Sequence, residues 1–188
     1  MALFSLTDQE KNTLLNLSRN TLGELFNINI KTLNNSDLEI TSSLSKQCGV
    51  FVSIYNHHEL RGCIGQFNST LPLYKLIEQV TLSSALNDYR FQPLKMEELK
   101  NLTIEISVLT PLERINSIDE LELGKHGIYI KKGLQSGTFL PQVANKTGWS
   151  KTEFVANCSK NKAGLGWDGW RDAELYRYEA IIFSGAFE

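Results

Sequence analysis

The sequence predicts an α+β fold, made of mixed sheets with hairpins and helices. Three observations support this class. Apolar residues recur at helical spacing in some segments, they alternate with polar residues at strand spacing in others, and two pairs of strand-like segments are joined by short turns. These patterns follow one another in mixed order along the chain. A doubly wound parallel sheet would require regular alternation of strands and helices, so it is not the expected class.

The first helix is expected to begin at Thr7. Its hydroxyl can accept a hydrogen bond from a free backbone amide, and Glu10, three residues further on, completes a capping box. Residues 27 to 45 are polar and rich in Asn, Ser and Thr, which predicts a loop. Between these points, apolar residues recur at helical spacing and indicate one buried face: Leu14, Leu15, Leu22, Leu25 and Phe26.

A hairpin is expected next. Residues 49 to 55 are rich in β-branched and aromatic side chains, residues 56 to 59 form a polar turn, and residues 60 to 67 form the second strand. Pro72 then suits the first turn of a helix with one apolar stripe, which ends at residues 87 to 90. Residues 103 to 110 form the clearest strand, because Glu105 and Ser107 alternate there with apolar residues.

The second half repeats the order of hairpin and helix. Residues 127 to 132 and 137 to 140 flank a glycine-rich turn, and Pro141 can open a short helix. Ser150 and Glu153 form a second capping box, which starts another helix. Residues 175 to 183 are expected to form one final strand. We therefore predict two hairpin-plus-helix units in one compact body.

Composition limits the classes of function. The chain has 188 residues, a net charge of −2, 41% hydrophobic residues and 21% charged residues, which suits one globular domain. The charge predicts no strong, salt-sensitive binding to nucleic acid, which a nucleic-acid column would test.

The first residues do not resemble a signal peptide, and no apolar run reaches the ~18 residues of a membrane span. Three cysteines, an odd number, favour reduced thiols in the cytoplasm.

The segment from Arg61 to Gly65, with the sequence RGCIG, is the main candidate site. Glycine inside a strand suggests a bulge or a close approach by another group. On an ideal strand Arg61 and Cys63 project to the same face, and a guanidinium near a thiol favours the nucleophilic thiolate. The structural alternative is that Cys63 is a small buried core residue, which is common for free cysteine.

Other candidates have weaker patterns. Asp88 and Arg90 either pair with each other or face a cleft, where they would offer an anion and a bidentate donor to a ligand. His126 precedes a strand and suits proton transfer, although a lone histidine is more often structural. Lys162 lies in a lysine-rich loop. The cysteines and histidines lack the paired spacings of a zinc site, so no metal is expected, and no nucleotide-binding motif indicates a cofactor.

Several segments together resemble one family. The hexapeptide LRGCIG is similar to the signature of the AMMECR-type domain family, also called AmmeMemoRadiSam system protein A. Further matches follow in the family's order over nearly the whole chain, although the family usually has serine or proline where Tyr89 stands. They are residues 85–91, 102–109, 140–143, 162–165 and the terminal Phe187-Glu188.

The resemblance implies one domain over residues 1–188, with internal duplication and two intimately packed lobes around a cleft. It implies a cytoplasmic protein without an established catalytic activity. It also implies two partners, a Memo-like protein and a radical-SAM protein. The family's characteristic positions correspond here to Arg61, Cys63, Asp88, Arg90, Gln142 and Lys162.

Two functional hypotheses follow. In the first, the chain is a thiol-dependent enzyme acting on a small polar or anionic substrate. Its catalytic residues would be Cys63, Arg61 and His126, and its substrate-binding residues would be Asp88, Arg90, Gln142 and Lys162. In the second, it is a non-catalytic ligand-binding or adaptor module that works with the Memo-like and radical-SAM proteins, and Cys63 is structural.

Overall fold

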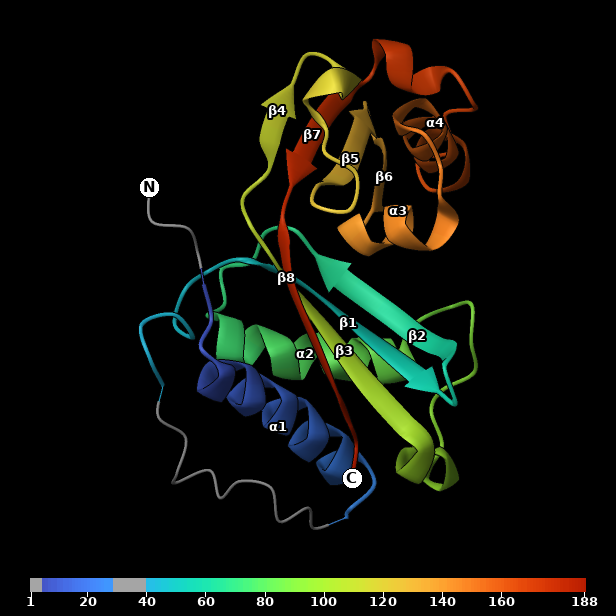
Figure 1. Cartoon of the computed structure of the whole chain (residues 1–188). Coiled ribbons are helices and arrows are strands. Elements are labelled where there is room, and N and C mark those ends of the chain that lie inside the picture. Colours follow the sequence, from blue (N-terminus) through green and yellow to red (C-terminus); the bar gives the residue numbers. More distant parts are fainter. Residues whose placement is uncertain (1–4, 29–39) are drawn as a thin grey trace. The chain divides into compact units, whose positions relative to one another are not determined.

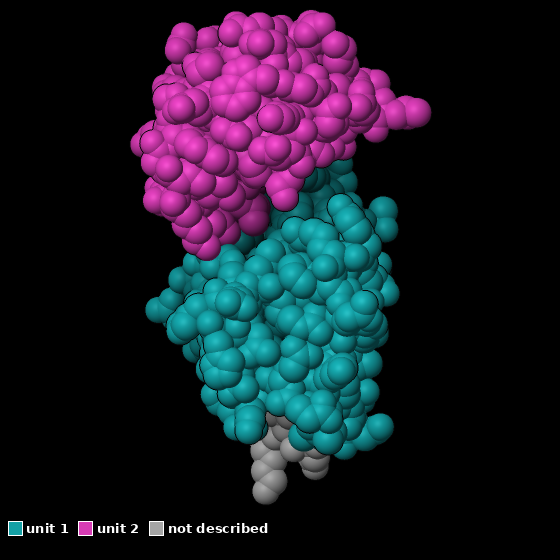
Figure 2. Space-filling view, turned by 90° about the vertical axis from the view of Figure 1, so that its right-hand side faces the viewer, with its two compact units in different colours: residues 1–109, 181–188 teal, residues 110–180 magenta. Residues whose placement is uncertain are grey.

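The computed structural model describes residues 5–28 and 40–188, and it confirms the α+β class. Helices are combined with two four-stranded sheets (Figure 1). The chain divides into two compact units, coloured separately in Figure 2. The first unit comprises residues 1–109 and 181–188, and the second comprises residues 110–180. No helix among the described residues is long and apolar enough to cross a membrane.

The first unit contains the predicted helix, hairpin, helix and strand. Its helices α1 and α2 lie on one face of a sheet with the strand order β2-β1-β3-β8 (Figure 1). The capping box of Thr7 and Glu10 begins α1, as predicted. The part of the predicted loop from 29 to 39 lies outside the described residues. The elements are α1 (Asp8–Leu25), β1 (Gly49–Asn56), β2 (Glu59–Gln66), α2 (Leu73–Leu86), the 3-10 helix η2 (Met96–Asn101), β3 (Leu102–Leu109) and β8 (Ala180–Ala186).

The second unit has a sheet with the strand order β4-β7-β5-β6, against which α3 and α4 pack. Pro141 opens α3 and the capping box of Ser150 and Glu153 begins α4, both as predicted. The hairpin is also confirmed. The elements are β4 (Glu113–Ile115), the 3-10 helix η3 (Ile118–Glu120), β5 (Gly127–Lys132), β6 (Gln135–Phe139), α3 (Pro141–Thr147), α4 (Lys151–Asn161), the 3-10 helix η4 (Gly169–Asp172) and β7 (Glu174–Tyr178).

The prediction of one final strand over residues 175 to 183 is wrong. The segment is divided at Glu179 into β7 and β8, which belong to different sheets. The backbone carbonyl of Glu179 accepts a hydrogen bond from the Thr110 N–H at 2.9 Å, and the Glu179 N–H donates to Thr110 Oγ1 at 2.8 Å. Thr110 thus forms hydrogen bonds with both the N–H and the carbonyl of Glu179, the residue that separates β7 from β8.

The two sheets share one strand order. In each, the second strand of the hairpin lies at the edge, the first strand lies next to it, and the strand that follows the helices comes third. This gives β2-β1-β3-β8 in the first unit and β6-β5-β7-β4 in the second. An internal duplication would produce this correspondence. The duplication and the cleft between lobes stay predictions.

Each unit has its own hydrophobic core. In the first unit, the apolar faces of β1 and β3 meet leucines of α1 and α2, and in the second, β5 meets Phe154 and its neighbours on α4. Burying apolar area of this kind, at roughly 25 cal/mol per Å², is the main force that holds each helical layer on its sheet. The opposite faces of β1 and β3 carry polar side chains, including Ser53, Tyr55 and Glu105.

Candidate functional site

Strand β2 carries the predicted site on the edge of the first sheet. Its register with β1 shifts between Ile54 and Tyr55, because Tyr55 lies opposite Leu60 and Ile54 opposite Gly62. Arg61 is therefore the extra residue of a β-bulge, which interrupts the regular alternation of side chains. Bulges are common where a strand re-aims a functional side chain. Glycine in this strand had predicted such an irregularity.

The Arg61 guanidinium is bound by protein groups. Its Nε donates to Glu98 Oε1 at 2.7 Å and its Nη2 donates to Glu98 Oε2 at 3.1 Å. The same guanidinium donates to the backbone carbonyls of Gln92 and Pro93 at 2.7 and 3.1 Å. These contacts tie β2 to the segment that leads into η2. In the predicted catalytic role, Arg61 would act with its guanidinium already bonded to Glu98 and to these two carbonyls.

Gly62 lets α2 approach the backbone of β2. A Cβ atom at this position would lie 2.1 Å from the backbone oxygen of Ser84. The Ser84 hydroxyl also joins the two layers, since it accepts a hydrogen bond from the Ile64 N–H at 3.0 Å and donates to the Val52 carbonyl at 2.8 Å. The close approach expected from a glycine in a strand is thus made by the last turn of α2.

Asp88 and Arg90, here called the edge clamp, bind the outer edge of β2 at Cys63. The Cys63 N–H donates to Asp88 Oδ2 at 2.8 Å, and Arg90 Nη2 donates to the Cys63 carbonyl at 3.3 Å. A neighbouring strand would satisfy these two groups in the same way. The two side chains also pair with each other, with Nη2–Oδ2 at 2.6 Å and Nε–Oδ1 at 2.9 Å. This confirms the pairing that the sequence left as one alternative.

The edge clamp is held together by charge. Asp88 is buried, and hydrogen bonding from the Arg90 guanidinium, joined by the Cys63 N–H, outweighs the effect of burial and lowers the pKa of Asp88 to about 2. The carboxylate therefore stays ionised at neutral pH. Unlike an ordinary surface pair, this ion pair has one nearly inaccessible partner, because the Asp88 side chain is 2% exposed and that of Arg90 36% exposed.

The Cys63 thiol is partly exposed on the polar side of the sheet. Ser53, directly opposite on β1, donates from its hydroxyl to Cys63 Sγ at 3.2 Å. Tyr55 and Glu105 lie close by and contact each other, with the phenol oxygen 3.5 Å from Oε1. Burial, together with the negative charge of Glu105, raises the pKa of Tyr55.

The sequence predictions missed Ser53 and Tyr55 as members of this site. The polar face was visible in the sequence, because Ser53 interrupts an apolar strand and residues two apart share a face, but the hairpin register was needed to place Ser53 opposite Cys63. Glu105 had been assigned to the polar face of its strand, but pairing of β1 with β3 was needed to place it beside Ser53.

Three further predicted residues belong to the second unit. His126 is buried, and its Nδ1 accepts a hydrogen bond from the Glu122 N–H at 3.0 Å, while Nε2 lies 3.8 Å from Glu179 Oε1. Gln142 is the second residue of α3 and is partly buried. Lys162 is exposed at the end of α4, with its Nζ 5.9 Å from the centre of the Phe139 ring. Their roles in a site shared with Cys63 stay predictions.

His126 is expected to make the stability of the protein depend on pH. Burial, and to a lesser extent the nearby Arg177, lowers the pKa of His126 below its ordinary value of 6.5. The unfolded chain therefore binds a proton more readily, so the stabilisation is complete above pH 6.5 and decreases as the pH falls. His126→Asn keeps an acceptor near the Glu122 N–H but does not titrate. Urea denaturation should show a weaker loss of stability below pH 6.5 in this variant, and an equal loss in both proteins would contradict this role.

No group of three or more potential metal-ligating His, Cys, Asp or Glu side chains occurs in residues 5–28 and 40–188.

The fold and the site define a two-unit α+β protein with a cysteine held on a clamped edge strand. The chain belongs to the AMMECR1 family, whose profile matches residues 15–183. The predicted resemblance is thereby confirmed.

Relatives and a solved structure agree with this assignment. A Pyrococcus furiosus protein is 38% identical over 157 residues, covering 77% of this chain and 74% of that protein. An Aquifex aeolicus protein is 42% identical over 149 residues, covering 75% and 74%. The crystal structure of the uncharacterized protein PH0010 from Pyrococcus horikoshii matches with a TM-score of 0.82 and 33% identity, covering 95% of this chain and 93% of that one.

Proposed function

We propose that the chain is a thiol-dependent enzyme that acts on a small polar or anionic substrate through Cys63. The observation that carries this proposal is the environment of the sulfur, which is partly exposed and accepts a hydrogen bond from Ser53. A hydroxyl donor stabilises the charged form of an acceptor more than the neutral form, so it favours the nucleophilic thiolate. Burial raises the pKa of Cys48, which is also partly exposed, to about 11 and that of the buried Cys158 to about 12.

The edge clamp supports the same proposal. It fixes the N–H and the carbonyl of Cys63 from outside the sheet, while Ser53 fixes the sulfur from the neighbouring strand. A reactive group held on a rigid strand by a second layer of bonds is pre-organised, which is a general requirement of catalytic sites. In this proposal Asp88 is a positioning residue, and Arg90 adds a fixed positive charge beside the thiol.

A ligand-binding or adaptor module is the second candidate. The observation that favours it is that Arg61, Asp88 and Arg90 are all bonded to protein groups, so their charges serve the architecture of β2. In this alternative Cys63 is structural, and the Memo-like and radical-SAM proteins of the family resemblance are the proposed partners. Reactivity of the thiol separates the two candidates.

Removing the Ser53 hydroxyl is expected to slow the alkylation of Cys63. One hydrogen bond contributes about 0.5–1.5 kcal/mol, so Ser53→Ala should lower the rate at pH 7 about twofold to tenfold. Mass spectrometry of iodoacetamide-treated protein measures the rate at each cysteine. Ser45→Ala, which removes an exposed hydroxyl bonded to the Thr41 carbonyl, is the matched control. An unchanged rate in Ser53→Ala would show that this contact does not activate the thiol.

Cys63→Ser is expected to leave stability nearly unchanged. The new hydroxyl would meet Ser53 and solvent, because the site is partly exposed and polar. In an apolar core, the same change would bury an unpaired hydroxyl at a cost of roughly 1–3 kcal/mol, and Cys63→Ala would be milder. Urea denaturation of the two variants measures the difference. A Ser variant much less stable than the Ala variant would make Cys63 a core residue and remove the main support for a thiol enzyme.

A further inference from the structure

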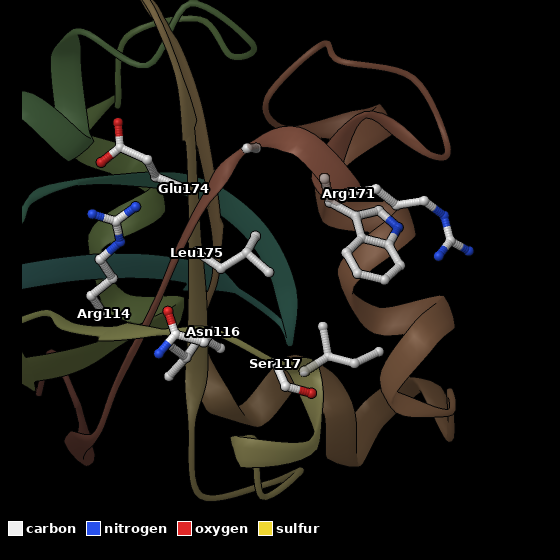
Figure 3. Close-up of a pocket in the computed structure, with 10 residues that line it drawn as sticks. Arg114, Asn116, Ser117, Arg171, Glu174 and Leu175 are labelled. Atoms are coloured by element: carbon white, nitrogen blue, oxygen red, sulfur yellow. The ribbon is translucent and has the colours of Figure 1, made fainter.

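A pocket of about 340 Å³ is lined entirely by residues of the second unit, none of which belongs to the thiol site (Figure 3). Pairing of β4 with β7 ends at Ile115 and Leu175. Beyond this point the chain after β4 turns into η3, and the chain before β7 comes from η4. The pocket opens where these two segments diverge, and its size is that of a site for a small molecule.

The lining of the pocket is largely polar, with an apolar part formed by Ile115, Ile118, Trp170 and Leu175. Ile115 and Leu175 are buried, Ile118 is partly buried, and Trp170 is 9% exposed. Arg171 lies over the indole of Trp170, with its guanidinium carbon 4.7 Å from the ring centre, and pairs with Asp168. In Figure 3 its guanidinium points away from Leu175. A planar apolar group of a ligand would therefore find a matching surface here.

Donors without protein partners surround this surface. The buried indole nitrogen of Trp170 has no hydrogen-bond acceptor among the described residues. Within the described residues, the Arg114 guanidinium and the Asn116 side-chain amide also make no hydrogen bond or ion pair. The carboxylate among the lining residues, Glu174, accepts a hydrogen bond from the Tyr176 hydroxyl at 2.5 Å, and the charge of Arg114 helps to lower its pKa. The lining, with two arginines and one glutamate, thus combines donors that lack a hydrogen-bond partner with a net positive charge.

We infer that this pocket binds a small organic anion, in which a carboxylate or phosphate group is attached to a planar apolar body. The anionic group meets Arg114 and Asn116, because a guanidinium matches the geometry of both kinds of oxyanion. The apolar body lies against Leu175 and Trp170. An acceptor of the ligand that reaches the indole nitrogen would also remove an unsatisfied buried donor.

Titration with simple probes, followed by NMR of the indole N–H of Trp170, tests this inference. Trp170→Phe assigns the resonance among those of the three tryptophans. The probes are benzoate, phenyl phosphate, benzyl alcohol and inorganic phosphate, each titrated to about 20 mM, well above the roughly millimolar Kd expected of ordinary ligands of this size. We expect a saturable shift with benzoate or phenyl phosphate, and whichever binds more tightly identifies the anionic group. Benzyl alcohol and inorganic phosphate should each bind at least about tenfold more weakly. Benzyl alcohol lacks the anionic group that makes the charge-assisted contact, and inorganic phosphate lacks the apolar body.

Variants distinguish a built site from general charge. Arg114→Gln should weaken binding of the anionic probe about tenfold, the loss of one charge-assisted contact. Lys160→Gln removes the same charge from an exposed position on α4 and should leave binding unchanged. No saturable shift, equal binding of benzyl alcohol, or equal weakening by both variants would overturn the inference. The outcome is independent of the thiol chemistry, because Cys63→Ser should bind the probes as the unmodified protein does.

Discussion

Gly62→Val is expected to destabilise the protein by about 3 kcal/mol or more, the largest effect of any single change considered, because overpacking against backbone leaves no side chain to move aside. A Cβ atom at this position would lie 2.1 Å from the Ser84 backbone oxygen. This clash can be relieved only if β2 and α2 separate. That separation would also break the hydrogen bonds of the Ser84 hydroxyl. Urea denaturation measures the loss.

Gly133→Ala is the matched control. Nothing lies within 4 Å of a Cβ atom there, and the only obstacle is the left-handed backbone, with φ of 60°. Such a change costs about 1 kcal/mol, from backbone conformation alone. A Gly62→Val variant no less stable than Gly133→Ala would mean that α2 does not pack on β2 as described.

Asp88→Ala is expected to cost about 2–3 kcal/mol, since it leaves the Cys63 N–H without an acceptor and Arg90 without its buried partner. The Asp88 carboxylate makes three of the contacts that hold the edge clamp together. Because Arg90 is partly exposed, water replaces some of what it loses, which keeps the effect below that of a fully buried pair. Asp172→Ala removes an exposed carboxylate paired with Lys132 and should change stability little. Equal effects of the two variants would contradict the described burial of Asp88.

The effect of Asp88 should disappear in acid. The pKa of its carboxyl is about 2 in the folded protein and near 3.8 without these contacts. The folded state therefore binds the proton less readily, so the contribution is complete above pH 3.8 and is lost as the pH falls toward 2. A shift of this size corresponds to about 2 kcal/mol. Denaturation of Asp88→Asn and of the unmodified protein should give curves that converge between these pH values, and curves that stay parallel would rule out a lowered pKa.

Local patterns predicted most of the fold. Capping boxes located the starts of α1 and α4, β-branched and aromatic content identified the first hairpin, alternation identified β3, and a glycine-rich turn identified the second hairpin. They failed at Glu179, where an apolar run continues but the backbone is bonded to Thr110. They also missed β4, because a strand of three residues is too short for alternation to show. Both misses depend on partners distant in sequence.

The site was only partly predictable for the same reason. The glycines of β2 indicated an irregular, closely approached strand, and Cys63, Asp88 and Arg90 do come together. The guanidinium of Arg61 was expected near the thiol, but it is bonded to Glu98, which no local pattern connects to β2. Ser53 was missed because its relation to Cys63 depends on the register of the hairpin, which a bulge displaces by one residue.

The pH dependence of alkylation at the three cysteines tests the central claim, that Cys63 is a reactive thiol, most directly. Iodoacetamide treatment between about pH 5 and 11, followed by mass spectrometry of each cysteine peptide, gives the three profiles in one protein. We predict that Cys63 reacts first and reaches half its maximal rate below pH ~8.5, the pKa of an unperturbed thiol. Cys48 and Cys158 serve as internal controls that stay slow, since burial raises their pKa values to about 11 and about 12. A Cys63 that reacts only above pH ~8.5, or no faster than Cys48, would show that Cys63 is not an activated thiol.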